Sequence, residues 1–370
     1  MVKALRRRSD QLGPLEPYLG EAPLEYKLVA YESLRTELAT QAVEYAAETA
    51  KLAVKIQRLR AALRSAVGIS RVDSVDPSTS TFGAADAGAN GRDLLIGVYP
   101  VITAVGATFR GASMISGPKS ATAKLPRLYG DEEEAKKLST LVGYYLQFEL
   151  ARHMLDEAKD GVLIDGPLIL RRSVYSPRGR YYGDTYVRAY WSAWRSLALL
   201  LEEARDRGVP VVGVVKRVRS TQVARRLGLD SIGDSALAAL CLSPGEYTSP
   251  LPMESAWADL VGHLREAGVH PRGLRPHSVL VRAGQGGQSY RVDVPEYALD
   301  RVHEIVSRLY SLRIPPSGLP VPIVAVDRLT RVTNREAALL HRRMFSTLAS
   351  RLGADRVDAL TLLTLQHGES

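Results

Sequence analysis

Two uninterrupted apolar runs constrain the fold more than any other part of the sequence. Residues 161–164 and 209–215 contain only Gly, Val, Leu, Ile and Pro. Residues 185–207, which lie between them, have the pattern of an amphipathic helix. Such runs are typical of parallel strands that are buried on both faces and joined by a crossover helix. The sequence therefore predicts an α/β protein.

Further elements are predicted on both sides of these strands. They are strands at residues 81–85, 94–109 and 111–116, a helix at 131–158, a hairpin around 283–287, and helices at 297–312 and 334–351. Residues 70–80 contain a proline with several Ser and Asp and are predicted to be a linker. We predict three parts: an N-terminal helical extension over 1–75, a main domain over 76–350, and a C-terminal helical tail over 351–370.

The N-terminal extension contains a long predicted helix. Residues 24–65 lack Gly and Pro, and a mostly apolar stripe recurs in alternating steps of four and three residues. Its members are Leu38, Ala42, Tyr45, Thr49, Leu52, Ile56, Leu59 and Leu63. A period of 3.5 residues indicates a helix that packs lengthwise on another helix. The sequence leaves open whether that neighbour belongs to the same domain, to a second copy or to a partner protein.

Charge and motif content limit the classes of function. The chain has 49 Lys and Arg against 40 Asp and Glu, a net charge of +9, which favours a polyanionic partner such as nucleic acid. The longest uncharged stretch, residues 94–109, is too short to span a membrane, and the N-terminus lacks the apolar run of a secretory signal. We therefore expect a cytoplasmic protein without a membrane association. A phosphate-binding Gly-Lys-Ser/Thr loop is also missing, which argues against ATP binding of that type.

Several acidic residues end or interrupt apolar segments. Asp165 directly follows the buried run 161–164, at the strand end where open α/β sheets carry their sites. Asp86 follows small residues that permit close approach, and Asp327 ends the apolar run 321–326. Glu149 lies on the same predicted helix face as Leu138, Val142, Tyr145 and Arg152, which we expect to be the core-facing stripe.

Each of these acids is by itself compatible with a helix cap, a turn or an ion pair. Four that converge in one cleft would repel each other unless cations lie between them, and hard carboxylate oxygens suit Mn²⁺ or Mg²⁺. Two such ions can activate a water and stabilise the leaving oxygen of a phosphodiester. We therefore predict Asp86, Glu149, Asp165 and Asp327 as metal ligands and catalytic residues of a nuclease.

Basic and aromatic residues accompany the predicted site. Lys216 follows the apolar run that ends at residue 215 and lies beside Asp165 if the two strands are neighbours. There it either contacts the scissile phosphate or pairs with an acid, and we predict it as a further catalytic residue. Arginines and tyrosines alternate in residues 171–186, a pattern that suits single-stranded nucleic acid but equally a loop packed on the next helix. The predicted nucleic-acid contacts are Arg171, Arg172, Tyr175, Arg178, Arg180, Lys216 and Arg217.

These segments together resemble the NurA family of archaeal DNA nucleases. The resemblance covers about residues 81–340. In the first half it is carried by Ala-Asp-Ala-Gly at 85–88, the helix with Glu149, and Leu-Ile-Asp-Gly-Pro-Leu at 163–168. In the second half it is carried by Val-Gly-Val-Val-Lys-Arg at 212–217 with Ser220, Gly-Asp-Ser at 233–235 through Gly-Glu at 245–246, and Gly-Leu-Pro-Val-Pro at 318–322 through Asp327. It implies a ribonuclease-H-like mixed central sheet flanked by helices, with a long N-terminal helix and C-terminal helical additions. Metal binding by Asp86, Glu149 and Asp165 is implied as well.

The family resemblance also implies an activity and partners. These are a Mn²⁺-dependent or Mg²⁺-dependent deoxyribonuclease with two ions, acting as a 5′–3′ exonuclease and single-strand endonuclease in DNA end resection during double-strand-break repair. The implied assembly is a homodimer that works with the hexameric HerA ATPase, and possible contacts extend to other break-repair proteins.

The chain departs from the family pattern in two places. Asp-Ala-Gly at 86–88 replaces the usual Asp-Gly-Ser, while Leu319 and Asp327 stand where the family has a tyrosine and, eight residues later, a histidine. Two rival interpretations follow. One is a ribonuclease-H-like subunit that binds nucleic acid without cutting it, and the other is a scaffold or clamp-loading subunit whose acids are structural.

Overall fold

A computed structural model of the chain describes residues 33–58, 60–94, 97–123, 132–170, 175–177, 183–216, 221, 223–224, 233–284, 289–315 and 317–352. The chain divides into two compact units, Met1–Lys55 and Ile56–Ser370. The predicted division at residues 75 and 350 stays a prediction, and the predicted tail from residue 353 onward lies outside the described residues.

The predicted N-terminal helix is present as α3 (Leu34–Arg58), and α4 (Arg60–Val67) follows it. The beginning of the prediction, residues 24–32, lies outside the described residues. Two apolar members of the heptad stripe are exposed, with Leu38 54% and Tyr45 76% accessible.

The centre of the second unit is a mixed sheet that has ten strands in the described part of the chain. The strands are β1 (Ile69–Arg71), β2 (Thr81–Leu94), β3 (Gly97–Arg110), β4 (Ser113–Ala123), β5 (Gly161–Asp165), β6 (Val211–Val215), β7 (Glu246–Thr248), β8 (Leu251–Pro252), β9 (Pro276–Arg282) and β10 (Ser289–Pro295). Their order is β1-β7-β9-β10-β6-β5-β2-β3-β4, and β8 pairs with β9. Strand β5 runs parallel to β2 and β6, and the other pairs are antiparallel.

The two apolar runs that predicted parallel strands form β5 and β6, which are hydrogen-bonded neighbours in parallel. The crossover helix between them is α7 (Asp184–Asp206). The predicted hairpin is the antiparallel pair β9–β10, whose connection at 285–288 lies outside the described residues. These findings confirm the predicted α/β fold with a mixed central sheet flanked by helices.

Strand β2 is much longer than the predicted 81–85 and continues to Leu94. Its middle is rich in Gly and Ala, which have low strand propensity, but pairing with β3 and β5 outweighs that preference. The small residues have a packing reason, because a Cβ at Gly83 would lie only 3.1 Å from the Met154 Cβ. The predicted linker also contains structure, since its first residues belong to β1 and pair with β7.

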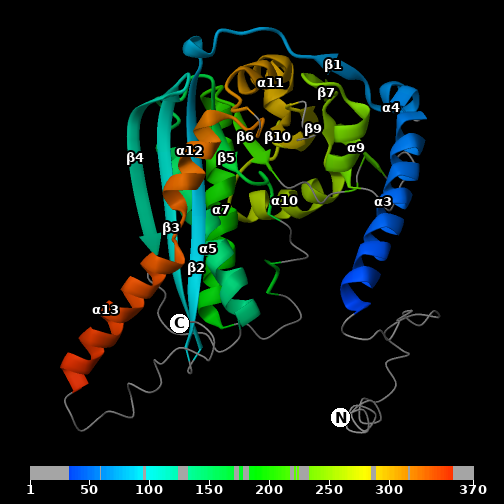
Figure 1. The fold of residues 1–370 in the computed structure, drawn as a ribbon. Helices are drawn as coiled ribbons and strands as arrows, with labels where there is room; N and C mark the ends of the chain where they lie inside the picture. Colours follow the sequence, from blue (N-terminus) through cyan, green and yellow to red (C-terminus); the bar gives the residue numbers. More distant parts are fainter. Residues whose placement is uncertain are drawn as a thin grey trace. The chain divides into compact units, whose positions relative to one another are not determined.

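Helices cover the sheet on both faces (Figure 1). One core lies between the sheet and α5 (Glu132–Arg152), α7 and α10 (Glu254–Glu266), and includes Phe148 and Trp194. The other lies under α11 (Val302–Ser311) and α12 (Val321–Thr330), and includes Phe82 and Ile323. The remaining described helices are α9 (Asp234–Cys241), α13 (Asn334–Leu352), η2 (Pro77–Thr79) and η3 (Glu296–Arg301). Among the described helices, none is long and apolar enough to cross a membrane.

The buried face of α5 differs from the predicted stripe. Leu138 and Val142 are buried as expected, but Tyr145 is 38% accessible and Glu149 is half-buried. The face turned to the sheet is marked by residues four apart: Ala135, Ser139, Gly143, Gln147 and Ala151. The small side chains of this face let the helix lie close to β2, where a Cβ at Gly143 would be 3.2 Å from the Ala87 Cβ.

Two aromatic residues of α5 test this orientation. Replacing the fully buried Phe148 by Ala should lower the free energy of unfolding by about 3–5 kcal/mol, because the change leaves a cavity in a packed core. The matched change Tyr145→Ala, at an exposed position of the same helix, should cost less than about 1 kcal/mol. Urea unfolding of both variants measures the difference, and equal costs would contradict the described helix face.

Candidate metal centre

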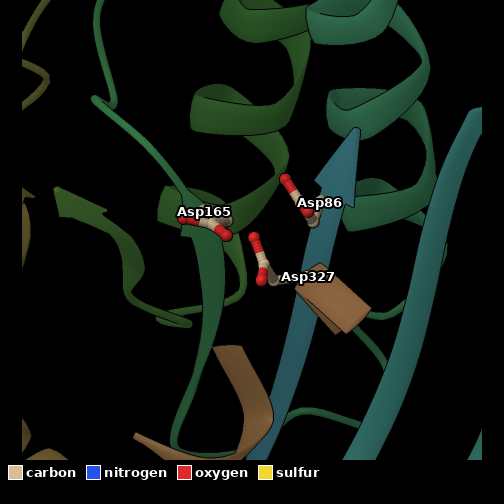
Figure 2. Close-up of side chains that lie close together, drawn as sticks. All are labelled: Asp86, Asp165 and Asp327. Carbon is tan, nitrogen blue, oxygen red and sulfur yellow. The ribbon is translucent and has the colours of Figure 1, made fainter. Parts of the chain in front are cut away.

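Three aspartates from distant parts of the sequence meet at one place. Asp86 lies in β2, Asp165 is the last residue of β5, and Asp327 lies in α12. One carboxylate oxygen from each lies within 4.8 Å of the other two. Figure 2 shows the three side chains gathered around a common point. The convergence that the sequence predicts for these three acids is therefore present in the structure.

The sheet fixes the first two carboxylates. Strands β2 and β5 are parallel neighbours, and their last paired residues are Ala85 and Ile164. Asp86 and Asp165 directly follow this pair, so both side chains point to the same face of the sheet at the same level. This is the face that α12 covers.

The third carboxylate comes from a helix where the apolar run 321–326 is followed by an acid. Prolines at 320 and 322 suit the start of α12, and the buried side chains Ile323, Val326 and Thr330 seat it on the sheet. Asp327 lies beside this stripe and is partly exposed, with 27% of its side chain accessible. The end of α12 approaches β2 so closely that a Cβ at Gly88 would lie 2.4 Å from the Thr330 carbonyl oxygen.

Asp86 is held by two hydrogen bonds. The Thr330 hydroxyl donates to Asp86 Oδ2 at 2.5 Å, and the Ala87 backbone N–H donates to Oδ1 at 2.7 Å. Burial nevertheless raises the pKa of Asp86 above its usual value, and the hydrogen bonds only reduce the effect.

Asp165 is the acid with the most perturbed protonation. Burial raises its pKa to about 7, with repulsion from Asp86 as the second cause, and the nearby Lys216 limits the rise. Two carboxylates at such a separation repel each other by about 3–4 kcal/mol at an effective dielectric constant of 20. The site therefore binds positive charge strongly, whether as protons or as cations.

Two basic side chains already contribute positive charge. Lys216 Nζ lies 2.5 Å from Asp165 Oδ2 and 2.9 Å from Asp327 Oδ1. Arg331 Nη2 lies 2.7 Å from the other oxygen of Asp327. Burial works against the charged form of Asp327, but hydrogen bonds from both cations outweigh it and lower the pKa of this acid. Burial likewise opposes the ammonium of Lys216, yet the two aspartates raise its pKa.

The carboxylates open into a cavity of about 630 Å³. Its walls are small residues of β2, Gly166 after β5, Lys216 after β6, and residues 330–334, which connect α12 with α13. The backbone at Gly166 has φ +120°, which favours glycine, and turns the chain away directly after Asp165. The three acids can thus be reached through this cavity.

Glu149, the fourth predicted metal ligand, is not brought to this cluster. Its carboxylate accepts hydrogen bonds from Arg152 at 3.1 Å and from the Ser196 hydroxyl at 2.6 Å, between α5 and α7. The reason is the orientation of α5, which points the face with Gln147, and not the face with Glu149, at the sheet. In this structure Glu149 is part of an ion-pair network that continues through Arg152 to Glu203.

Two polar residues of the site were not predicted. The buried Gln147 carboxamide donates to the carbonyl oxygens of Ala85 at 2.8 Å and Asp165 at 3.1 Å, and so links β2 to β5 where their pairing ends. Thr330 supplies the hydroxyl that binds Asp86. The spacing of small residues every four positions in α5 was a usable signal, because Gln147 is the one large polar side chain in that series.

Most of the predicted nucleic-acid contacts lie outside the described residues. They are Arg171, Arg172, Arg178, Arg180 and Arg217. Tyr175 is described and half-buried, and its ring packs edge-on against Tyr144 at 6.4 Å between centroids. Its carbonyl oxygen accepts a hydrogen bond from the Tyr186 hydroxyl. Stacking of Tyr175 on a base stays a prediction.

The raised pKa of Asp165 leads to a test in the metal-free protein. A carboxyl that binds its proton more tightly in the folded chain lowers the free energy of unfolding as the pH rises from about 4 to about 7. Asp165→Asn removes this ionisation, so its stability relative to wild type should rise by on the order of 1–4 kcal/mol between pH 4 and pH 8. Urea unfolding in the presence of a chelator measures this difference. A difference that is independent of pH would show that Asp165 titrates normally.

Comparison with known proteins gives the family context. The family model of the NurA domain matches residues 80–332. The NurA nuclease from Sulfolobus solfataricus has a similar structure, with a TM-score of 0.63, 15% sequence identity, and coverage of 86% of this chain and 98% of that one. A NurA structure with bound dAMP and manganese has a TM-score of 0.54 and 12% identity over 90% of this chain and all of that one. No curated protein matches the sequence.

The structural neighbours are too dissimilar in sequence to show more than a common fold, and they agree with the mixed sheet and flanking helices described above. The domain match is stronger, because it extends over more than half of the chain and includes all three clustered aspartates. On this basis the chain belongs to the NurA family.

Proposed function

We propose that this protein is a divalent-metal-dependent DNA nuclease. The observation that carries the proposal is the convergence of Asp86, Asp165 and Asp327, three carboxylates from three separate elements, at the floor of an open cavity. Buried like charges destabilise a fold unless they are neutralised, so a cluster of this kind indicates a cation-binding role.

The donor set fits Mn²⁺ or Mg²⁺. All three groups offer hard carboxylate oxygens, and no His or Cys belongs to the cluster among the described residues. The Lys216 ammonium lies between two of the carboxylates, which supports a cation-binding site at this position. We expect Asp86, Asp165 and Asp327 to hold two ions, which would supply an activated water and stabilise the leaving oxygen of a phosphodiester.

The protein's own groups would bind and orient the substrate. Lys216 and Arg331 border the cavity and can contact phosphate oxygens, Lys216 as a point charge and Arg331 through its planar guanidinium. Asp165 must lose its proton to bind a metal, so its raised pKa predicts weaker metal binding below neutral pH. Arg217 and the arginines of residues 171–180 belong to the proposal as further contacts with DNA.

Finer parts of the proposal come from the family resemblance. They are 5′–3′ exonuclease and single-strand endonuclease activity in end resection of double-strand breaks, a homodimer, and cooperation with a hexameric HerA ATPase in the cytoplasm. The exposed apolar side chains of α3 and α13, such as Leu38 and Leu339, support a protein contact of some kind. A related NurA binds manganese and dAMP, which supports a metal ion and a deoxynucleotide as ligands.

Single substitutions test the activity. Asp86→Asn, Asp165→Asn and Asp327→Asn should each lower Mn²⁺-dependent hydrolysis of end-labelled DNA by about a hundredfold or more, because bound metal ions supply several kcal/mol of transition-state stabilisation. Asp156→Asn is the matched control, since this aspartate is 84% accessible, pairs only with Arg207 among the described residues, and should retain full activity. DNA binding, measured by filter retention with a chelator present, should persist in all variants.

The non-catalytic interpretation would be supported instead if the wild-type protein binds DNA but cleaves neither single-stranded nor double-stranded DNA with Mn²⁺ or Mg²⁺. Leu319 is the observation behind that interpretation. It packs against the core beneath α11 and α12 and offers no phenol to the site.

A further inference from the structure

Lys216 is placed between two acids of the cluster by the parallel pairing of β5 and β6. Asp165 pairs with Val214, so the residue that follows β6 by one position lies beside the end of β5. The Lys216 ammonium then contacts Asp165 at 2.5 Å and Asp327 at 2.9 Å. Lys216 thus adds an ionic contact between the sheet and α12 to the apolar contacts of Ile323 and Val326.

The ammonium is the group that neutralises the cluster from within. Three carboxylates that share a partly buried pocket repel each other, and Lys216 is the cation that contacts two of them. Only 22% of its side chain is accessible, so it is a defined part of the site and not a solvated surface lysine.

We propose that Lys216 is the built-in counter-ion of the metal-free site, and that a divalent metal ion binds by displacing its ammonium from Asp165 and Asp327. This proposal rests on the proposed metal site and adds a competition to it. The oxygens that Lys216 contacts belong to two of the three predicted metal ligands, so the lysine and a metal ion compete for the same atoms.

The side chain is suited to such a displacement. A lysine carries its charge on a flexible four-carbon stem, and Lys216 lines the same cavity of about 630 Å³ as the acids. After displacement the ammonium needs another anion, and a phosphate in this cavity would provide one. Metal binding and substrate binding would therefore support each other.

Arg331 provides a matched comparison. It carries the same charge and contacts the same Asp327, but through Oδ2 only, and it lies at the rim with 70% of its side chain accessible. Removal of Arg331 changes the charge of the site without opening the position between Asp165 and Asp327. The two variants thus separate displacement from a general electrostatic effect.

The first experiment measures Mn²⁺ binding to the full chain without DNA, by the electron paramagnetic resonance signal of free Mn²⁺. Lys216→Met should bind Mn²⁺ about tenfold more tightly than wild type or better, because binding no longer requires an ion pair to break. Arg331→Gln should change the affinity by less than about threefold, as expected for one exposed charge. Lys216→Met should also have a lower melting temperature than wild type in a chelator and regain it with Mn²⁺.

The second experiment uses the wild-type chain, so that it does not depend on the folding of a variant. Reductive methylation of lysines is followed by mass spectrometry with and without Mn²⁺. Lys216 should be protected in the metal-free protein and become several-fold more reactive with Mn²⁺, while the exposed Lys136 reacts equally in both. The same comparison with Ca²⁺ in place of Mn²⁺ shows whether any divalent ion suffices.

The outcomes distinguish this proposal from the proposed function. Three results would overturn the counter-ion role while leaving the metal site in place. They are an equal gain of Mn²⁺ affinity in both variants, an unchanged Mn²⁺ affinity in Lys216→Met, and a reactivity of Lys216 that is the same with and without Mn²⁺. Wild type and Lys216→Met that both bind no Mn²⁺ would overturn the metal site and this proposal with it.

Discussion

Mutual repulsion of three carboxylates is the constraint around which this part of the molecule is organised. Parallel pairing of β2 with β5 forces Asp86 and Asp165 to the same level of the same face, and the docking of α12 adds Asp327. Nearby groups reduce the cost of this arrangement. Thr330 donates to Asp86, and Lys216 contacts two acids. The pKa of Asp165 is still raised, first by burial and then by repulsion from Asp86. Such a cluster costs stability, and it is the basis of the metal site proposed above.

The two faces of the sheet differ in what they carry. Both faces carry an apolar core, one under α5 and α7 and the other under α11 and α12, and only the second face also carries the three acids. Gln147 of α5 supports the strand ends, because its carboxamide donates to a carbonyl oxygen of β2 and to one of β5 where the two strands stop pairing. The spacing of Asp86 and Asp165 is thus supported by α5, which lies on the opposite side of the sheet from α12 (Figure 1).

The sequence predicted the parts of this structure that depend on local pattern. Uninterrupted apolar runs identified β5 and β6, and their parallel pairing then placed Lys216 beside Asp165. Asp86 and Asp327 were predicted as site residues because an acid directly after small or apolar residues is unusual. The extent of β2 could not be predicted, since its Gly and Ala residues become a strand only through pairing on both sides. The predicted sheet-facing side of α5 was wrong. The prediction placed Leu138, Val142 and Tyr145 on that side, whereas close packing on β2 requires the small residues one position further along, Ser139 and Gly143.

The packing of α12 on β2 determines when, during synthesis, the cluster of acids can be completed. Gly88 and Thr330 touch, and the hydrogen bond from Thr330 to Asp86 joins residues 244 positions apart. Closing a loop of this length costs conformational entropy, so this contact depends on the rest of the fold to keep its two ends close. During synthesis, the growing polypeptide has its first two acids long before the third has left the ribosome. The complete cluster of three carboxylates therefore exists only once translation is nearly finished.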